Sequence, residues 1–285
     1  MIYGTKTMKM AVMGDPIDHS LSPFLHGAII EEYGYDALYI PVRVAPDDTG
    51  DFARAAARME FCGFNATMPH KIRLMDIVDK LDEKASLYQA VNTVRIRDGI
   101  LTGSNTDVDG LMAALAGRSI QVKNADVMMI GAGGVAGALL RGFCEKGASS
   151  VIVLNRTVSK AESIAENLQG VTVCELTPEN LSEAASRSDL IVNCTPLGMT
   201  GVNGDFDDLS FLDNTRAFVV DLVYNPWKTR LLEYAEKRGL KIMNGLPMLI
   251  CQGLLSFQMF TDIRLDLDKE FEYLYPLCRG RMLSE

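Results

Sequence analysis

Short apolar runs alternate with longer amphipathic segments along nearly the whole chain. The short runs have the length of buried strands, and the longer segments repeat apolar residues at helical spacing. This alternation predicts an α/β fold with largely parallel sheets. The expected strands are Met8–Met13, Leu38–Val42, Gly63–Ala66, Thr93–Ile96, Val127–Ile130, Ser150–Leu154, Leu190–Asn193 and Phe218–Leu222. The expected helices are Pro23–Tyr33, Thr49–Met59, Val108–Ala116, Val135–Lys146, Lys160–Leu168, Pro226–Arg238 and Leu246–Thr261.

The length of the chain predicts two domains. A single domain usually has about 100–200 residues, and this chain has 285. The apolar fraction of 48% and the charged fraction of 23% are those of an ordinary globular protein, so each domain can form a hydrophobic core. No repeat and no linker of biased composition marks the boundary, which therefore has to be inferred from the motifs.

The net charge argues against two kinds of partner. The 28 Lys and Arg residues are outnumbered by 37 Asp and Glu residues, which gives a net charge of −9. Because nucleic acids and anionic membranes attract basic proteins, we expect neither as a partner. The uncharged stretch 127–140 has 14 residues, too few to span a bilayer. The first fifteen residues contain no apolar signal segment, so we expect a cytoplasmic protein.

Cysteine and histidine usage predicts neither disulfides nor a metal site. The six cysteines are scattered without a Cys-x-x-Cys pair, and the histidines are His19, His26 and His70. We therefore expect buried thiols and no bound metal.

Residues 131–136 carry the fingerprint of a dinucleotide-binding turn. A buried-strand pattern over 125–129 leads into Gly131-Ala132-Gly133-Gly134-Val135-Ala136, which opens a helix. In such a turn the first glycine permits a tight bend and the second lets the backbone approach a pyrophosphate, while a small residue lets the helix pack on the strand. The alternative interpretation is a simple tight turn between a strand and a helix.

The residues after the next strand favour NADP(H) over NAD(H). An NAD site usually has an acidic residue there, which accepts hydrogen bonds from the ribose hydroxyls. This chain instead has Asn155, Arg156 and Thr157, followed one turn later by Lys160. Guanidinium and ammonium groups suit a 2′-phosphate. The alternative is that Arg156 and Lys160 are solvated residues at a helix entry.

Two serines between the first strand and the first helix could hold a small anion. Ser20 and Ser22 both lie in the segment 14–26, which reads Gly-Asp-Pro-Ile-Asp-His-Ser-Leu-Ser-Pro-Phe-Leu-His. From composition alone, Ser22 could equally be the cap that precedes Pro23 at the start of the helix.

Six further segments combine polar residues, glycine and proline at characteristic spacing. Together with the serine segment and the dinucleotide turn, they make the chain resemble the shikimate dehydrogenase family, in colinear order over residues 9–262. The six segments are Gly63–Lys71, Ala90–Thr93, Ser104–Gly110, Asn193–Met199, Asp221–Pro226 and Gly245–Gly253.

The resemblance implies a domain arrangement and a set of site residues. It implies a split substrate domain, about 1–107 completed by 245–285, and an inserted NADP-binding Rossmann domain, about 108–244. It also implies that Ser20 and Ser22, helped by Tyr224, hold the substrate carboxylate. The other implied residues are Thr67, Asn92 and Gln252 at the ring oxygens, Lys71 and Asp107 as the catalytic pair, and Thr195 and Gly245 at the cofactor.

The chemistry of hydride transfer explains why a site of this kind would need a pair such as Lys71 and Asp107. Negative charge develops on the ketone oxygen, and an ammonium within hydrogen-bond reach stabilises that charge and delivers a proton. Because a neighbouring carboxylate couples the two titrations, the formal proton donor stays open. The simpler interpretations are a solvated Lys71 and an Asp107 that caps the helix from Val108. His19 and His70 are weaker acid–base candidates, because the resemblance does not select them.

The function that the resemblance implies is NADPH-dependent reduction of 3-dehydroshikimate to shikimate, in aromatic amino acid biosynthesis, by a monomer or homodimer. The alternatives are a paralogue that acts on quinate or an aminated shikimate analogue, and a non-enzymatic NADPH-binding sensor. Apart from the histidines, no third polar residue beside Ser20 and Ser22 is evidently reserved for the extra hydroxyl of quinate. We therefore expect kcat/KM for quinate to be lower than for shikimate by roughly one to two decades.

Overall fold

The computed structural model describes residues 3–284, and the chain divides into two compact units. Unit 1 runs to Leu111 and resumes over Leu249–Cys278, while unit 2 covers Met112–Met248 and the residues from Arg279 onward. The boundaries fall within three helices: α5 (Asp107–Ala116), α10 (Leu246–Thr261) and α11 (Leu267–Leu283). The sequence predicts divisions at 107/108 and 244/245, with the whole C-terminal segment in the substrate domain.

Unit 1 is built around a six-stranded sheet in the order β2-β1-β3-β5-β6-β4. Strand β1 runs parallel to β2 and β3, while β5 is antiparallel to both β3 and β6. The elements other than the three shared helices are β1 (Met8–Gly14), α1 (Ser22–Glu32), β2 (Ala37–Arg43), η1 (Pro46–Asp48), α2 (Thr49–Arg58), β3 (Phe61–Ala66), α3 (His70–Arg73), η2 (Leu74–Asp76), β4 (Lys80–Leu81), α4 (Glu83–Tyr88), β5 (Thr93–Arg97) and β6 (Ile100–Ser104).

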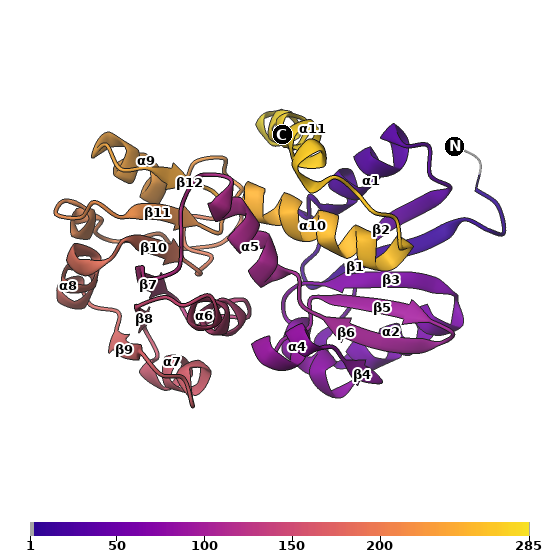
Figure 1. The fold of residues 1–285 in the computed structure, drawn as a ribbon, viewed down its shortest axis with the longest axis horizontal. Coiled ribbons are helices and arrows are strands. Elements are labelled where there is room, and N and C mark those ends of the chain that lie inside the picture. The colour runs from indigo at the N-terminus through magenta and orange to yellow at the C-terminus, as the bar shows by residue number, and fades with distance from the viewer. Residues whose placement is uncertain (1–2, 285) are drawn as a thin grey trace. The chain divides into compact units, whose positions relative to one another are not determined.

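Helices cover both faces of this sheet. Successive side chains on a strand point to opposite faces, and β3 shows the alternation clearly. A Cβ added to Gly63 would meet the ring of Phe260 on α10 at 2.3 Å, whereas Phe64 makes an edge contact with Phe52 on α2. The sheet therefore lies between α10 and α2 (Figure 1). This arrangement leaves the ends of the strands, rather than their faces, for polar chemistry.

Unit 2 has a fully parallel six-stranded sheet in the order β12-β11-β10-β7-β8-β9. This is the strand order of a doubly wound dinucleotide-binding domain, with its switch point between β7 and β10. The elements are β7 (Asp126–Ile130), α6 (Ala136–Glu145), β8 (Ser150–Asn155), α7 (Val158–Ala165), β9 (Val171–Glu175), α8 (Pro178–Arg187), β10 (Leu190–Asn193), η3 (Ser210–Leu212), β11 (Phe218–Asp221), α9 (Arg230–Lys237) and β12 (Ile242–Met243).

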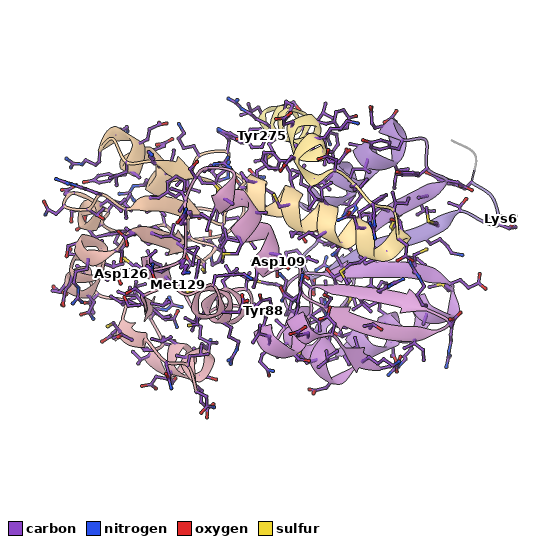
Figure 2. All side chains as sticks on the ribbon, in the orientation of Figure 1. Lys6, Tyr88, Asp109, Asp126, Met129 and Tyr275 are labelled. Atoms are coloured by element: carbon purple, nitrogen blue, oxygen red, sulfur yellow. The ribbon has the colours of Figure 1, made fainter. Side chains whose placement is uncertain are left out.

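Both faces of the second sheet are buried as well. Met128 and Ile130 of β7 belong to a core that includes residues of α8 and α9. The intervening Val127 and Met129 are equally buried and point to the other face. Figure 1 shows α6 and α8 on opposite sides of β7, and Figure 2 shows Met129 inside unit 2 and Lys6 at the surface of unit 1.

The α/β fold that the sequence predicts is confirmed, with corrections to individual elements. The first sheet is mixed rather than largely parallel, because β5 and β6 form an antiparallel hairpin. Helix α9 begins at Arg230 rather than Pro226, because the Thr229 hydroxyl accepts a hydrogen bond from the backbone N–H of Leu232 and caps the helix there. Within residues 3–284, no helix is long and apolar enough to cross a bilayer.

Candidate active site

The centre of the candidate site is an ion pair between two elements of unit 1. Lys71 lies in the short helix α3 after β3, and Asp107 is the first residue of α5. The Lys71 Nζ lies 2.7 Å from the Asp107 Oδ2, and the two side chains are only 13% and 7% exposed. Lys71 is therefore not a solvated surface residue. Asp107 is not the cap of α5 either, because it is the first residue of that helix and its two carboxylate oxygens accept from Lys71 and Asn92.

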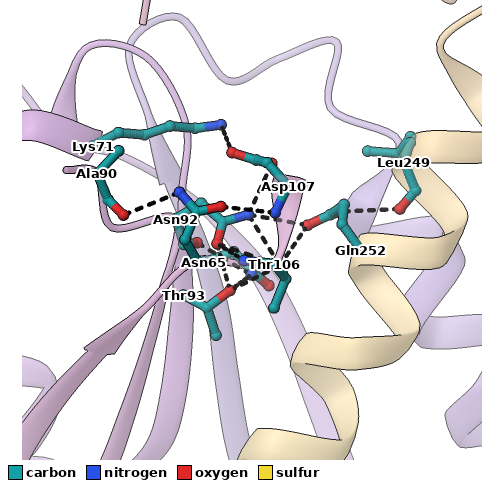
Figure 3. Close-up of polar contacts among 10 residues, drawn as sticks. Asn65, Lys71, Ala90, Asn92, Thr93, Thr106, Asp107, Leu249 and Gln252 are labelled. Carbon is teal, nitrogen blue, oxygen red and sulfur yellow. Dashed lines mark hydrogen bonds and ion pairs between the residues drawn. The ribbon is translucent and has the colours of Figure 1, made fainter. Parts of the chain in front are cut away.

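Asn92 holds the other oxygen of the Asp107 carboxylate. Its Nδ2 donates to the Asp107 Oδ1 at 2.8 Å and to the Thr106 Oγ1 at 3.0 Å. Its Oδ1 accepts the Thr106 backbone N–H at 2.8 Å and the Thr93 hydroxyl at 2.9 Å. Each carboxylate oxygen thus has its own donor, as Figure 3 shows. Such a carboxylate is held in one orientation beside the ammonium.

Gln252 enters the same cluster from α10. Its Oε1 lies 3.5 Å from the Asn92 Nδ2 and 3.4 Å from the Thr106 Oγ1, and its Nε2 donates to the Leu249 carbonyl at 2.8 Å. Gly110 makes this approach possible, because a Cβ there would meet the Gln252 Cβ at 2.7 Å. The structure therefore brings Lys71, Asp107, Asn92 and Gln252 together.

The other expected substrate residues of unit 1 lie at the carboxyl ends of β1 and β3. The Thr67 backbone N–H donates to the Met13 carbonyl, which ties the ends of the two strands together. Ser22 begins α1, but the cap residue is Leu21 and no side-chain cap is formed. The capping alternative for Ser22 is thus wrong. The backbone N–H of Ser22 instead donates to the Ser20 Oγ at 3.4 Å, which places the two serines together.

The two histidines beside these motifs have different surroundings. His19 is exposed, whereas His70 is fully buried. The Thr49 hydroxyl donates to the Pro46 carbonyl at 2.6 Å, so its oxygen accepts the Nδ1–H of His70 at 2.8 Å. Burial is the main cause that lowers the pKa of His70. A neutral His70 therefore anchors α3, next to Lys71, on the start of α2.

The glycine-rich turn of unit 2 has the backbone that a dinucleotide needs. Gly131 has a φ of +103°, and a Cβ there would meet the Thr195 Cγ2 at 2.6 Å. Gly133 and Gly134 are exposed, and a Cβ on Gly133 would meet no atom closer than 3.9 Å, which leaves room beside the turn. Ala136 is buried at the start of α6. These residues fit a pyrophosphate close to the backbone.

The end of β8 fits the additional phosphate of NADP(H). Asn155 ends the strand, and its side chain bridges the two loops by accepting the Ala132 N–H at 3.2 Å and donating to the Thr157 carbonyl at 2.8 Å. Arg156 and Lys160 are both exposed at this point. Two exposed cations without an acidic neighbour in the stretch 155–160 suit a 2′-phosphate.

A buried carboxylate organises the carboxyl ends of β10 and β11. Asp221 accepts hydrogen bonds from the Asn193 Nδ2 at 2.9 Å, the Val223 N–H at 3.1 Å and the Thr229 hydroxyl at 2.6 Å. Burial raises the pKa of Asp221 to about 6, and the hydrogen bonds oppose that shift. Tyr224 lies in the turn that follows, partly buried.

Three further observations concern Thr195, Gly245 and metal binding. The Thr195 hydroxyl donates to the Asn193 Oδ1 at 2.6 Å, which fixes it beside the glycine-rich turn. Gly245 packs against the Leu222 carbonyl, which a Cβ would meet at 2.0 Å. Among the described residues, 3–284, no group of His, Cys, Asp or Glu side chains could hold a metal ion, and the six cysteines are free thiols.

Comparisons with known proteins show the family to which the chain belongs. Sequence models of the shikimate dehydrogenase substrate binding domain and of shikimate/quinate 5-dehydrogenase match residues 12–94 and 114–223. The NADP(+) shikimate dehydrogenase of Nitrosopumilus maritimus is 38% identical over 253 residues, which are 88% of this chain and 92% of that protein. The chain belongs to the shikimate dehydrogenase family.

Solved structures of the family agree with this assignment. Shikimate 5-dehydrogenase from Listeria monocytogenes, in complex with shikimate and NAD, has a TM-score of 0.85 at 31% identity and covers 95% of this chain and 98% of its own. The Thermus thermophilus enzyme, in complex with NADP(H) and shikimate, has a TM-score of 0.83 at 32% identity, with 94% and 99% covered. Membership of the shikimate dehydrogenase family confirms the oxidoreductase class and the NADP(H) cofactor that the sequence predicts.

The sequence analysis missed three polar residues of the cluster. Asn65, Thr93 and Thr106 are buried and hydrogen-bonded to one another or to Asn92. Each lies inside one of the segments that carry the resemblance, but the resemblance assigns none of them a role. The available signal was a set of polar residues at the ends of otherwise apolar strands, where burial requires a hydrogen-bond partner.

Proposed function

We propose that this member of the shikimate dehydrogenase family catalyses the reversible NADPH-dependent reduction of 3-dehydroshikimate to shikimate in aromatic amino acid biosynthesis. The observation that carries the proposal is the largely buried pair of Lys71 and Asp107, in which Asn92 holds the Asp107 carboxylate within one polar cluster. An ammonium and an oriented carboxylate at 2.7 Å form an acid–base pair of the kind that a ketone and its alcohol require.

Lys71 is the residue that contacts the reacting oxygen. NADPH supplies the hydride when it is bound. The Lys71 Nζ donates a hydrogen bond to the ketone oxygen and stabilises the negative charge that develops there. The Asp107 Oδ2 holds the ammonium at 2.7 Å, and because Asn92 occupies its other oxygen, the carboxylate cannot rotate away. The pair shares the proton that the new hydroxyl receives.

The substrate is bound at two ends. Ser20 and Ser22 donate to its carboxylate with help from Tyr224, and the hydroxyls of the ring contact Thr67, Asn92 and Gln252. The two serines are close together in unit 1, and Asn92 and Gln252 have amide groups 3.5 Å apart, which supports these roles. We assign unit 1 as the substrate domain and unit 2 as the cofactor domain.

The turn after β7 and the loop after β8 would hold the cofactor. The exposed backbone at Gly133 and the exposed cations Arg156 and Lys160 support this placement. The complete proposed set is Gly131, Ala132, Gly133, Gly134, Val135, Ala136, Asn155, Arg156, Thr157, Lys160, Thr195 and Gly245.

The enzyme acts on small molecules in the cytoplasm, as a monomer or homodimer, and nucleic acid is not its partner. The net charge of −9 supports the last point, because the phosphodiester backbone repels an acidic protein.

The test is oxidation by NADP(+) with shikimate, quinate and an aminated shikimate analogue offered separately. We expect shikimate to give the highest kcat/KM and quinate to be lower by roughly one to two decades, because the serine segment lacks a partner for the additional hydroxyl. A kcat/KM for quinate equal to that for shikimate would support the alternative hypothesis of a paralogue that acts on quinate. No oxidation of any of the three, in protein that binds NADPH, would favour the sensor.

A further inference from the structure

The polar cluster continues inward from the substrate residues to a buried tyrosine on β2. The Tyr39 hydroxyl donates to the Asn65 Oδ1 at 2.7 Å, and both side chains are almost completely buried. Asn65 stands on β3, and its Nδ2 donates to the Thr93 Oγ1 at 3.1 Å and to the Asn92 carbonyl at 3.3 Å. A continuous series of hydrogen bonds therefore leads from Tyr39 to Asn92.

The donors in this series determine which way each amide faces. Ser256 also approaches the Asn65 Oδ1, at 3.4 Å, but its single proton has closer acceptors in the carbonyls of Gln252 and Gly253 at 3.1 and 3.0 Å. Tyr39 is thus the main donor to the Asn65 oxygen. Because that oxygen faces Tyr39, the Asn65 NH₂ group must face Thr93.

The same logic carries the orientation on to the catalytic pair. The Thr93 oxygen accepts from Asn65, so its own proton is free for the Asn92 Oδ1 at 2.9 Å. That oxygen also accepts the Thr106 N–H at 2.8 Å. Because the Asn92 oxygen accepts both of these donors, the NH₂ group of Asn92 faces the Asp107 Oδ1, at 2.8 Å. A reversed amide would set NH₂ against the Thr106 N–H.

The ring of Tyr39 is itself held in place. It stacks on the His26 ring, with centroids 3.9 Å apart and an interplanar angle of 7°. The His26 ring in turn contacts Phe257, with centroids 5.9 Å apart. Burial lowers the pKa of His26 to about 3, so the ring is neutral and adds no charge to the stack. Burial also raises the pKa of the Tyr39 phenol, which keeps its donor proton.

We propose that Tyr39 is a positioning residue, which sets the amide of Asn92 for the substrate and for Asp107 by way of Asn65 and Thr93. This inference rests on the proposed function and adds a residue that lies outside the substrate contacts. Tyr39 acts together with the Thr106 N–H, so a donor four hydrogen bonds from Asp107 contributes to how well the substrate ring is bound. Figure 3 shows the part of the series from Asn65 to Lys71.

The expected effect of Tyr39→Phe is selective. The variant keeps the stack on His26 and removes only the proton that orients Asn65. Because Asn92 contacts the substrate in the ground state and the transition state alike, KM for shikimate should rise about fivefold to tenfold, the effect of one buried hydrogen bond. The kcat should fall less than about threefold, because Lys71 still holds the Asp107 carboxylate, and KM for NADP(+) should not change.

The experiment compares Tyr39→Phe with Tyr35→Phe. Tyr35 lies four residues before Tyr39 and is partly buried, and its ring packs against Tyr33 and Phe257, outside the hydrogen-bonded series. A second comparison adds Tyr39→Phe to Asn65→Ala, where Tyr39 should have no further effect on KM if it acts through Asn65. Asn65→Asp, which still accepts from Tyr39 but cannot donate to Thr93, should raise KM with Tyr39 intact.

Two results would overturn the proposal. One is an unchanged KM for shikimate in Tyr39→Phe, and the other is an equal rise in the wild-type and Asn65→Ala backgrounds. A readout that needs no catalysis separates this failure from that of the proposed function. The side-chain amide resonances of Asn92, assigned with Asn92→Asp, should shift in ligand-free Tyr39→Phe and stay in place in Tyr35→Phe. A wild-type protein inactive on shikimate would refute the function and leave that spectral test valid.

Discussion

Replacing Lys71 with methionine removes the ammonium while keeping most of the volume of the side chain. The Lys71 Nζ is 2.7 Å from the Asp107 Oδ2, and the two side chains are 13% and 7% exposed, so little water can replace the lost donor. Asp107 keeps one strong partner, Asn92, at 2.8 Å. We expect the free energy of unfolding to fall by about 1–3 kcal/mol, the cost of leaving one buried polar partner unpaired.

The effect on catalysis should be much larger than the effect on binding. Loss of positioned acid–base help costs about 10²–10⁴ in rate, whereas the ammonium matters most once charge develops on the oxygen. Lys71→Met should therefore lose that factor in kcat and keep KM for shikimate within a few-fold. The assay is NADPH formation at saturating NADP(+), with urea unfolding of the same samples.

A matched surface pair supplies the control. Lys84 pairs with Asp109, two residues after Asp107 on α5, but the Lys84 side chain is 52% exposed. Exposed pairs contribute at most about 1 kcal/mol, so Lys84→Met should leave kcat unchanged and stability nearly so. Should Lys71→Met keep half of the wild-type kcat, or behave like Lys84→Met, the role given to the buried pair is wrong.

Two further predictions concern unit 2. Arg156→Ala should weaken NADPH binding by roughly 1.5–3 kcal/mol, the range for a charge-assisted hydrogen bond, and leave NADH almost unaffected; equal losses measured by titration for both cofactors would make Arg156 a structural residue. Asp221 has a folded-state pKa of about 6, above its usual 3.8, so its protonation favours folding at low pH and that contribution disappears as the pH rises through 6. Relative to Asp221→Asn, the wild type should therefore lose on the order of 1 kcal/mol of unfolding free energy between pH 5 and pH 8. Urea unfolding of both proteins checks this, and a parallel pH dependence would contradict it.

The parallel sheet of unit 2 was the most predictable part of the fold. Its central strands are buried on both faces, so each appears in the sequence as a continuous apolar run, and β10 was predicted at its observed bounds, Leu190–Asn193. The turn after β7 was predictable for a related reason. Gly131 has the positive φ and the crowded neighbour that require glycine, and its motif follows directly from an apolar strand.

Some missed elements had visible signals. Asp98 and Gly99 have φ values of +50° and +75° and form the tight turn between β5 and β6, and Asp-Gly between two strand-like runs is a hairpin signal. Thr177 caps α8 through the Asn180 N–H, with Pro178 next to it, which is a recognisable helix start. Helix α11 has a weaker pattern, because only a few of its side chains are buried.

The polar cluster had only a weak signal in the sequence, namely polar residues at the ends of otherwise apolar strands. Asn92 and Gln252 are 160 residues apart, and only the packing of α10 against α5 brings their side chains together. Whether a buried amide is satisfied depends on such distant partners, not on local spacing. The resemblance to a family therefore identified Lys71, Asp107 and Asn92, while the connection through Asn65 to Tyr39 required the structure.

The most direct test of the central claim is the reduction of 3-dehydroshikimate by NADPH, with product and cofactor measured in the same reaction. The account predicts one shikimate formed for each NADPH consumed by the wild type, a much lower rate with NADH, and a loss of about 10²–10⁴ in Lys71→Met. Consumption of NADPH without formation of shikimate, or the same rate in wild type and Lys71→Met, would contradict it.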